Sequence, residues 1–152
     1  QRVVSFNEKN FNLKIPNNYK FNKDDQQILN TYSSNIENLI NSIDNQNINY
    51  YVNFIQEQLF AANKYFNDQE PWKKKSDKER LNSILYVSLE LIRKISILLY
   101  PIIPESSIKA LKAFNITEDK IDFNSIKNHE ILKVNSDINK IPILFKKITK
   151  ND

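Results

Sequence analysis

Hydrophobic residues recur at helical spacing along the first two-thirds of the chain. Residues 1–11 carry Val3 and Phe6 on one face, which predicts the end of a helix. Residues 24–43 and 47–67 then show apolar residues at steps of three and four, joined by a short turn that predicts two antiparallel helices. These two stripes contain Ile28, Tyr32, Ile36, Leu39 and Ile43, then Ile48, Val52, Ile55, Leu59, Ala62 and Phe66.

A fourth helix is predicted from just after Ser76 to Tyr100. Ser76 and Glu79 have the spacing of a capping box, as do Asp24 and Gln27 before the second helix. The fourth helix is apolar on much of its circumference, so we expect it to be the central one. Pro101 and Pro104 end it, and a shorter helix is predicted over residues 105–114.

The other segments lack helical periodicity. Residues 12–23 and 68–75 predict loops. Residues 115–152 are polar with scattered Ile and Phe, and residues 141–145 predict an extended strap. Because no set of alternating strands is present, the sequence predicts an all-α, antiparallel helix bundle. We expect one domain over residues 1–152, with a less regular tail and a first helix whose beginning precedes Gln1.

The composition excludes several kinds of chemistry. The 152 residues include no Gly, no Cys and one His. Gly-rich phosphate loops, thiol catalysis and Cys-based metal sites therefore cannot occur. We expect no catalytic residue, no metal site and no cofactor in this chain. No apolar run is long enough to span a membrane, and the lack of disulfides fits the cytoplasm. The net charge of +4 permits a polyanionic partner.

Glu90 and His129 are titratable residues whose positions in the sequence allow a prediction. Glu90 lies three residues before Arg93 in the apolar fourth helix, and we interpret it as an ion-pair partner rather than a catalytic carboxylate. His129 lies in a polar, irregular stretch and is predicted to be a solvated surface residue.

The segment after the third helix contains the only Trp. Pro71 precedes Trp72, and Lys73, Lys74 and Lys75 follow it, while Lys64 lies one helical turn before the helix end. Unpaired bases stack on aromatic faces and Lys neutralises phosphates, so this segment could bind single-stranded RNA. A second interpretation remains open, in which Trp72 caps the core where two helices meet.

Several motifs together resemble one protein family. The run Ala62-Asn63-Lys64-Tyr65, followed after five residues by Pro71-Trp72, is similar to the link between two helices in the anticodon-binding domain of methionyl-tRNA synthetases. The next helix resembles the family's following helix through Arg80, Leu85-Tyr86, Leu89-Glu90, Ile92-Arg93, Ile97-Leu98-Leu99 and Pro101-Ile-Ile-Pro104. The segments 1–6 and 143–148 resemble the family's first helix end and its tail, although Lys146 replaces a usual Pro.

This resemblance implies roles for particular residues. Trp72 would stack on the wobble-position cytosine of the anticodon, and Pro71 would shape its loop. Arg2 matches an anticodon-contacting arginine, whose partner asparagine would lie four residues earlier, before Gln1. Lys64, Lys73 and Lys74 are our own candidates for contacts to the RNA backbone.

The resemblance also implies a larger parent enzyme. A catalytic Rossmann-type domain outside this chain would bind ATP with Mg²⁺ and couple methionine to tRNA(Met). The partners of this chain would then be the anticodon loop of tRNA(Met) and that catalytic domain. We expect neither DNA nor a membrane as a partner. Because the motifs of the fourth helix are shared with the Val, Leu, Ile and Cys enzymes, one alternative is an anticodon-binding domain of that kind. A second alternative is a helical protein-interaction bundle without an RNA role.

Overall fold

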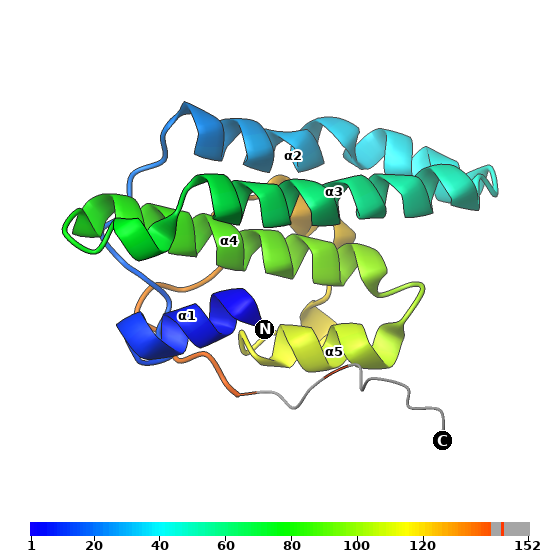
Figure 1. Cartoon of the computed structure of the whole chain (residues 1–152). Helices are drawn as coiled ribbons and strands as arrows, with labels where there is room; N and C mark the ends of the chain where they lie inside the picture. Colours follow the sequence, from blue (N-terminus) through cyan, green and yellow to red (C-terminus); the bar gives the residue numbers. More distant parts are fainter. Residues whose placement is uncertain (141–143, 145–152) are drawn as a thin grey trace, which may run out of the picture.

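The computed structural model describes residues 1–140 and 144, and within them the chain is helical, as predicted (Figure 1). The one β-bridge in the described residues pairs Lys14 with Asp137. The elements in chain order are α1 (Arg2–Phe11), α2 (Lys23–Asp44), α3 (Ile48–Asp68), the 3₁₀ helix η1 (Pro71–Lys73), α4 (Lys78–Leu99), α5 (Pro104–Lys112), η2 (Glu118–Lys120) and η3 (Phe123–Lys127).

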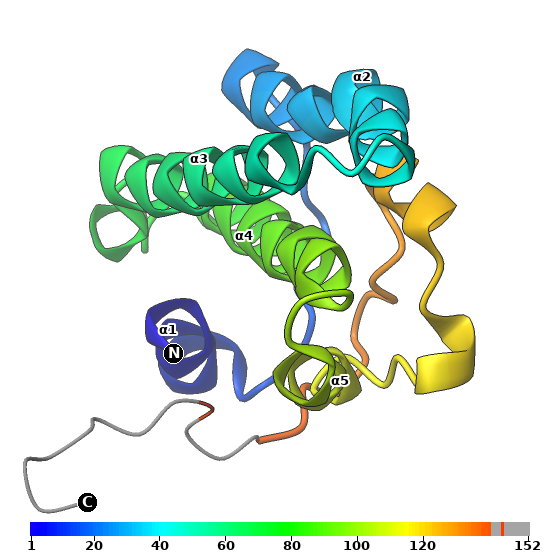
Figure 2. The ribbon, with the colours of Figure 1, turned by 90° about the vertical axis from the view of Figure 1, so that its right-hand side faces the viewer.

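Helix α4 is the centre of the molecule, as its all-round apolar sequence predicts. It packs against every other α-helix and against η1 and η3 (Figure 2). All residues from Ser83 to Leu91 are buried. A helix that is apolar on much of its circumference can only be accommodated when neighbours cover most of it, and here α1, α2, α3 and α5 do so.

The helix starts differ from two predictions. The capping box of α2 is formed by Asn22 and Asp25, each side chain accepting the other's backbone N–H at 3.0 Å, and not by Asp24 and Gln27. At α4 the capping side chain is Asp77, which accepts the Arg80 N–H at 3.0 Å, and not Ser76. Both prediction errors have one reason: several neighbouring residues can cap, and the tertiary path of the incoming loop selects among them.

The predicted stripe of α3 was also partly wrong. Ile48 and Leu59 are 53 % and 41 % exposed, and Ile43 at the end of α2 is 39 % exposed. The buried face of α3 is instead defined largely by aromatic residues: Tyr51, Phe54, Ile55, Gln58, Tyr65 and Phe66. Two apolar stripes lie side by side on this helix, and the larger aromatic side chains bury more area when they face α2 and α4.

The tail is irregular, as predicted, but it contributes to the core. Ile126, Leu132 and Ile138 are buried. Two backbone hydrogen bonds join the tail to the loop after α1: Ile15 N–H donates to the Ser136 carbonyl at 2.9 Å, and Ile138 N–H donates to the Leu13 carbonyl at 2.6 Å. The predicted strap over residues 141–145 lies, apart from Leu144, outside the described residues.

No helix among residues 1–140 combines the length and the apolarity that a bilayer crossing requires.

Candidate nucleic-acid interface

The corner between α3 and α4 carries the predicted Pro71-Trp72 pair. Glu70 adopts a left-handed conformation with φ 44°, which turns the chain away from α3 without a glycine. Pro71 then occupies the first position of η1 and is buried, because its fixed φ suits a helix start and its N–H is not needed there. The Lys73 N–H closes this turn by donating to the Glu70 carbonyl at 2.8 Å. Pro71 thus shapes the corner from which Trp72 projects.

Trp72 is 39 % exposed, so it is neither fully buried in the core nor fully solvated. Its ring packs edge-on against Phe66 with a centroid distance of 6.3 Å. The Arg2 guanidinium carbon lies 5.2 Å from the Trp72 ring centroid and 5.3 Å from that of Phe66. Arg2 Nη1 also donates to Asn67 Oδ1 at 2.5 Å. Phe66 and Arg2 therefore hold the indole in place, while 39 % of the residue stays exposed to solvent.

Arg2, Phe66, Asn67 and Trp72 form what we call the Trp72 corner. Arg2 and Trp72 are both predicted from the resemblance, and the structure brings them together although 70 positions separate them. Phe66 as a partner of the indole and Asn67 as an acceptor were not predicted. A guanidinium over an aromatic ring contributes on the order of 0.5–2 kcal/mol, so this cation holds the ring orientation as well as supplying charge.

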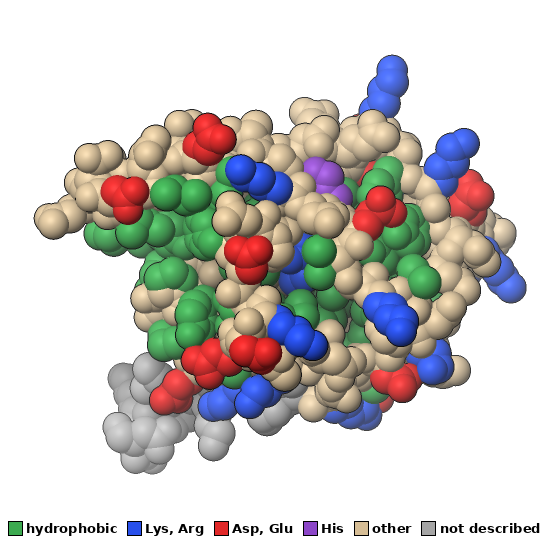
Figure 3. Space-filling model, turned by 180° about the vertical axis from the view of Figure 1, so that it is seen from behind, with side chains coloured by type: hydrophobic (Ala, Val, Ile, Leu, Met, Phe, Trp, Pro, Cys, Tyr) green, Lys and Arg blue, Asp and Glu red, His purple; other side chains and the backbone are tan. Residues whose placement is uncertain are grey.

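The surface beside the corner is less basic than the Lys run suggests. Lys64 pairs with Asp68, and Lys73 Nζ lies 2.7 Å from Glu70 Oε1. Lys74 is exposed and forms no ion pair with any described residue. On the rear face, acidic and basic side chains are likewise intermixed (Figure 3). The cation that lies against the Trp72 ring is Arg2.

A buried ionic network locks the two helices that flank the corner. Asp25 is fully buried at the start of α2. It accepts hydrogen bonds from Arg80 Nη1 at 2.6 Å, from Arg80 Nη2 at 3.0 Å and from the Tyr65 hydroxyl at 2.5 Å. Arg80 Nη2 also donates to Gln69 Oε1 at 2.6 Å. Burial, followed by the hydrogen bond to Asp25, raises the pKa of Tyr65, which keeps the hydroxyl a donor. Asp25 therefore ties the last turn of α3 to the first turn of α4.

A second buried cluster holds the tail on α4. Glu90 and Arg93 form the predicted ion pair, with 2.7 Å between Glu90 Oε2 and Arg93 Nε and no exposed side-chain surface. Glu90 Oε1 accepts the backbone N–H groups of Ile131 and Leu132, each at 2.8 Å. Arg93 in turn donates to the Ser125 hydroxyl and carbonyl, each at 3.2 Å, and to the Asn128 carbonyl at 2.9 Å. This arrangement supports a structural role, as the sequence analysis predicted for Glu90.

The prediction for His129 was only partly right, because the residue lies at the surface but is half-buried and held by several contacts. Its Nδ1 lies 3.1 Å from the Nζ of buried Lys94, and its Nε2 lies 3.2 Å from Ser33 Oγ and 3.1 Å from Asn30 Oδ1. Burial, then the nearby Lys94 and Arg93 charges, lower the pKa of His129 to about 4. The imidazole is therefore a neutral packing partner. A polar sequence neighbourhood could not reveal this, because the contacts come from residues 35 or more positions away.

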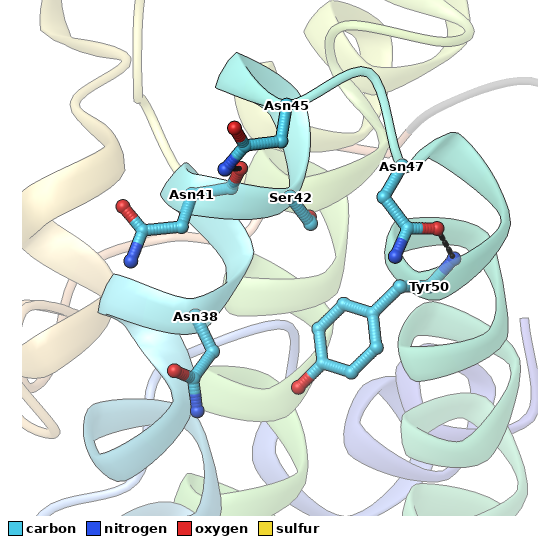
Figure 4. Close-up of a pocket in the computed structure, with 6 residues that line it drawn as sticks. All are labelled: Asn38, Asn41, Ser42, Asn45, Asn47 and Tyr50. Atoms are coloured by element: carbon cyan, nitrogen blue, oxygen red, sulfur yellow. Dashed lines mark hydrogen bonds between the residues drawn. The ribbon is translucent and has the colours of Figure 1, made fainter.

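The hollow at the opposite end of α3 offers no comparable chemistry (Figure 4). It has a volume of about 310 Å³ and is lined by Asn38, Asn41, Ser42, Asn45, Asn47 and Tyr50. The interactions drawn there are local to the helix ends: Asn47 Oδ1 accepts the Tyr50 N–H at 3.2 Å, and Asn45 Nδ2 donates to the Asn41 carbonyl at 2.8 Å. None of the six lining side chains carries a charge at neutral pH. Within residues 1–140, no group of three or more His, Asp or Glu side chains is arranged to hold a metal ion.

Together these features define a class of domain: a helical bundle that displays a cation–aromatic cluster at a helix junction. Comparison with known proteins identifies the family of this domain. The family described as the anticodon binding domain of methionyl tRNA ligase matches residues 15–152. The chain therefore belongs to this family. This result favours the methionyl family over the Val, Leu, Ile or Cys alternative and over the interaction-bundle alternative.

Individual relatives agree with this assignment. The methionine–tRNA ligase of Brucella suis is 32 % identical over 127 residues, covering 83 % of this chain and 25 % of that protein. The methionine–tRNA ligase of Ureaplasma parvum is 33 % identical over 111 residues, covering 72 % and 21 %. This chain thus spans about a quarter of the length of such relatives.

The solved structures give the same fold. The free form of Mycobacterium tuberculosis methionyl-tRNA synthetase superposes with a TM-score of 0.88 at 26 % identity, covering 98 % of this chain and 31 % of that one. The same synthetase in complex with methionyl-adenylate gives a TM-score of 0.87 at 27 % identity, covering 97 % and 30 %. The all-α bundle predicted from the sequence is therefore confirmed as this family's fold.

Proposed function

We propose that this chain reads the anticodon loop of tRNA(Met), with Trp72 stacking on one unpaired base. The observation that carries the proposal is the partly exposed indole, which contacts Phe66 and Arg2 and still has 39 % of its residue surface exposed. Stacking is suited to unpaired bases because every base has a π-face. A ring that is already oriented loses little conformational freedom on binding.

The neighbouring residues would add specificity and charge. Arg2 Nη1 donates a hydrogen bond to Asn67, and the remaining N–H donors of Arg2 suit the edge of a base. Pro71 shapes the corner. Lys74 would contact the RNA backbone directly, whereas Lys64 and Lys73 would first have to leave Asp68 and Glu70.

The rest of the proposal concerns the parent protein. Its relatives are named methionine–tRNA ligases, so we propose that the parent couples methionine to tRNA in the cytoplasm and that this chain supplies anticodon recognition beside a catalytic domain. ATP and Mg²⁺ would bind that domain, since a chain without glycine cannot form a Gly-rich phosphate loop.

A substitution at Trp72 tests the proposal. Trp72→Ala should weaken binding to a stem-loop with a CAU anticodon by about 5- to 150-fold, which corresponds to the 1–3 kcal/mol of base–aromatic stacking. Its melting temperature should change little, because the ring is already partly solvated. Tyr50→Ala is the matched control: Tyr50 is also 39 % exposed but lies at the other end of α3. Unchanged RNA affinity of Trp72→Ala, together with a large loss of stability, would reject the stacking role.

A further inference from the structure

The outward face of α3 carries a straight row of amide side chains with one aromatic residue at its centre. The row consists of Asn49, Asn53, Gln56, Phe60, Asn63 and Asn67, at alternating steps of four and three, and all six residues are exposed. We call it the amide row. Helix α3 lies at the front in Figure 1 and at the left edge in Figure 2, and no other helix of the described residues covers this face.

Phe60 is unusual for a surface residue. It is 79 % exposed, against 53 % for Ile48, which is the next most exposed large hydrophobic residue in the described part of the chain. Its neighbours at three and four positions along the helix are Gln56, Glu57, Asn63 and Lys64, all polar. The ring therefore does not belong to a broad apolar patch of the kind that marks a protein–protein interface.

The row is continuous with the Trp72 corner. Its last member, Asn67, accepts the hydrogen bond from Arg2, whose guanidinium lies over Trp72. Asn67 follows Phe60 by seven positions along the helix, which corresponds to a rise of about 10 Å. A strand whose base occupies Trp72 would therefore meet Phe60 after a short step along α3.

The chemistry of the row suits unpaired bases. Amide groups both donate and accept, and they can match the Watson–Crick edge of an exposed base. An isolated, solvent-facing ring offers a flat surface for stacking.

We propose that Phe60 and the amide row form a second base-binding site, which takes an unpaired nucleotide of the same RNA whose anticodon base lies on Trp72. This inference rests on the proposed function, because it extends the Trp72 site along α3.

The test compares substitutions at Phe60 in the full 152-residue chain. Phe60→Ala should weaken binding to the CAU stem-loop by about fivefold or more, while Phe60→Trp, which keeps a ring, retains affinity. Phe60→Leu keeps apolar volume but no ring face and should behave like Phe60→Ala. Ile48→Ala is the matched control, because it truncates an exposed hydrophobic residue of the same helix away from the row. The double variant with Trp72→Ala should lose the product of the two single losses, since separate bases are involved.

The outcomes separate this inference from the proposed function. Wild-type affinity in Phe60→Ala, together with weakened binding in Trp72→Ala, overturns the second site and leaves the Trp72 site intact. Wild-type affinity in Phe60→Leu also overturns stacking at Phe60. A dimer of the wild-type chain in sedimentation that becomes monomeric in Phe60→Ala would assign the face to a second copy and contradict the inference. No saturable binding of the wild-type chain to any stem-loop would reject both proposals.

Discussion

Asp25 offers a quantitative test of how the Trp72 corner is held. Asp25→Ala removes the only carboxylate of the described residues that Arg80 and Tyr65 contact, and it leaves a guanidinium with 16 % side-chain exposure beside a buried hydroxyl. Breaking a buried ion pair by removing one partner costs about 3–5 kcal/mol, because the other charge stays behind. The loss of the α2 capping box adds about 1 kcal/mol. The free energy of unfolding should therefore fall by about 4–6 kcal/mol, or roughly 8–24 °C in Tm for a chain of this size.

The assay follows urea unfolding by circular dichroism and by fluorescence. Since Trp72 is the only Trp, its fluorescence reports the corner alone. In Asp25→Ala the urea midpoint of the fluorescence change should be lower than that of the circular dichroism signal, or equal to it. Asp24→Ala is the matched control, because Asp24 is exposed and has one weak contact of 3.4 Å with Gln69; it should cost less than about 0.5 kcal/mol. A cost for Asp25→Ala below about 1 kcal/mol, or equal to that of Asp24→Ala, would refute the argument that this network supports the corner.

Two further predictions concern protons and salt. The pKa of His129 is lowered to about 4 in the folded chain from an ordinary value near 6.5, so the unfolded chain binds the proton more strongly and stability is lost as the pH falls from about 6.5 towards 4. After allowance for solvent screening, the free energy of unfolding should be about 1 kcal/mol lower at pH 5 than at neutral pH. Between these two pH values the Tm of the wild type should therefore fall by about 2–4 °C more than the Tm of His129→Gln. Parallel curves of Tm against pH for the two proteins would contradict this prediction. For RNA binding, Lys74→Ala should reduce the slope of log affinity against log salt by about 0.7, as expected for one phosphate contact to a single strand. Lys73→Ala should change the slope less, because Glu70 already neutralises Lys73, and equal changes in both variants would show that this ion pair does not matter.

The sequence predicted those features that depend on local pattern. Helix α4 was recognised as central because its apolar residues cover most of its circumference, and the Glu90–Arg93 pair followed from a spacing of three within that helix. The corner at Pro71 and Trp72 was visible because proline and the only Trp interrupt a regular stripe.

Features that depend on distant contacts could not be predicted in this way. Nothing near His129 in the sequence indicates Lys94 or Ser33 as its neighbours. Asp25 looked like an ordinary residue of a helix start, and only the fold brings Arg80 and Tyr65 to it. The burial of α3 was misjudged at Leu59 for a related reason, since two apolar stripes compete and the packing of α2 and α4 decides which one turns inward.

If a base stacks on Trp72, as we propose, the emission of this single indole should report the contact directly. Titration with the CAU stem-loop should quench the Trp72 emission saturably, and the same stem-loop with a valine anticodon, GAC, should require much higher concentrations. A complex that forms with unchanged Trp72 emission, or equal titration curves for both stem-loops, would contradict the account.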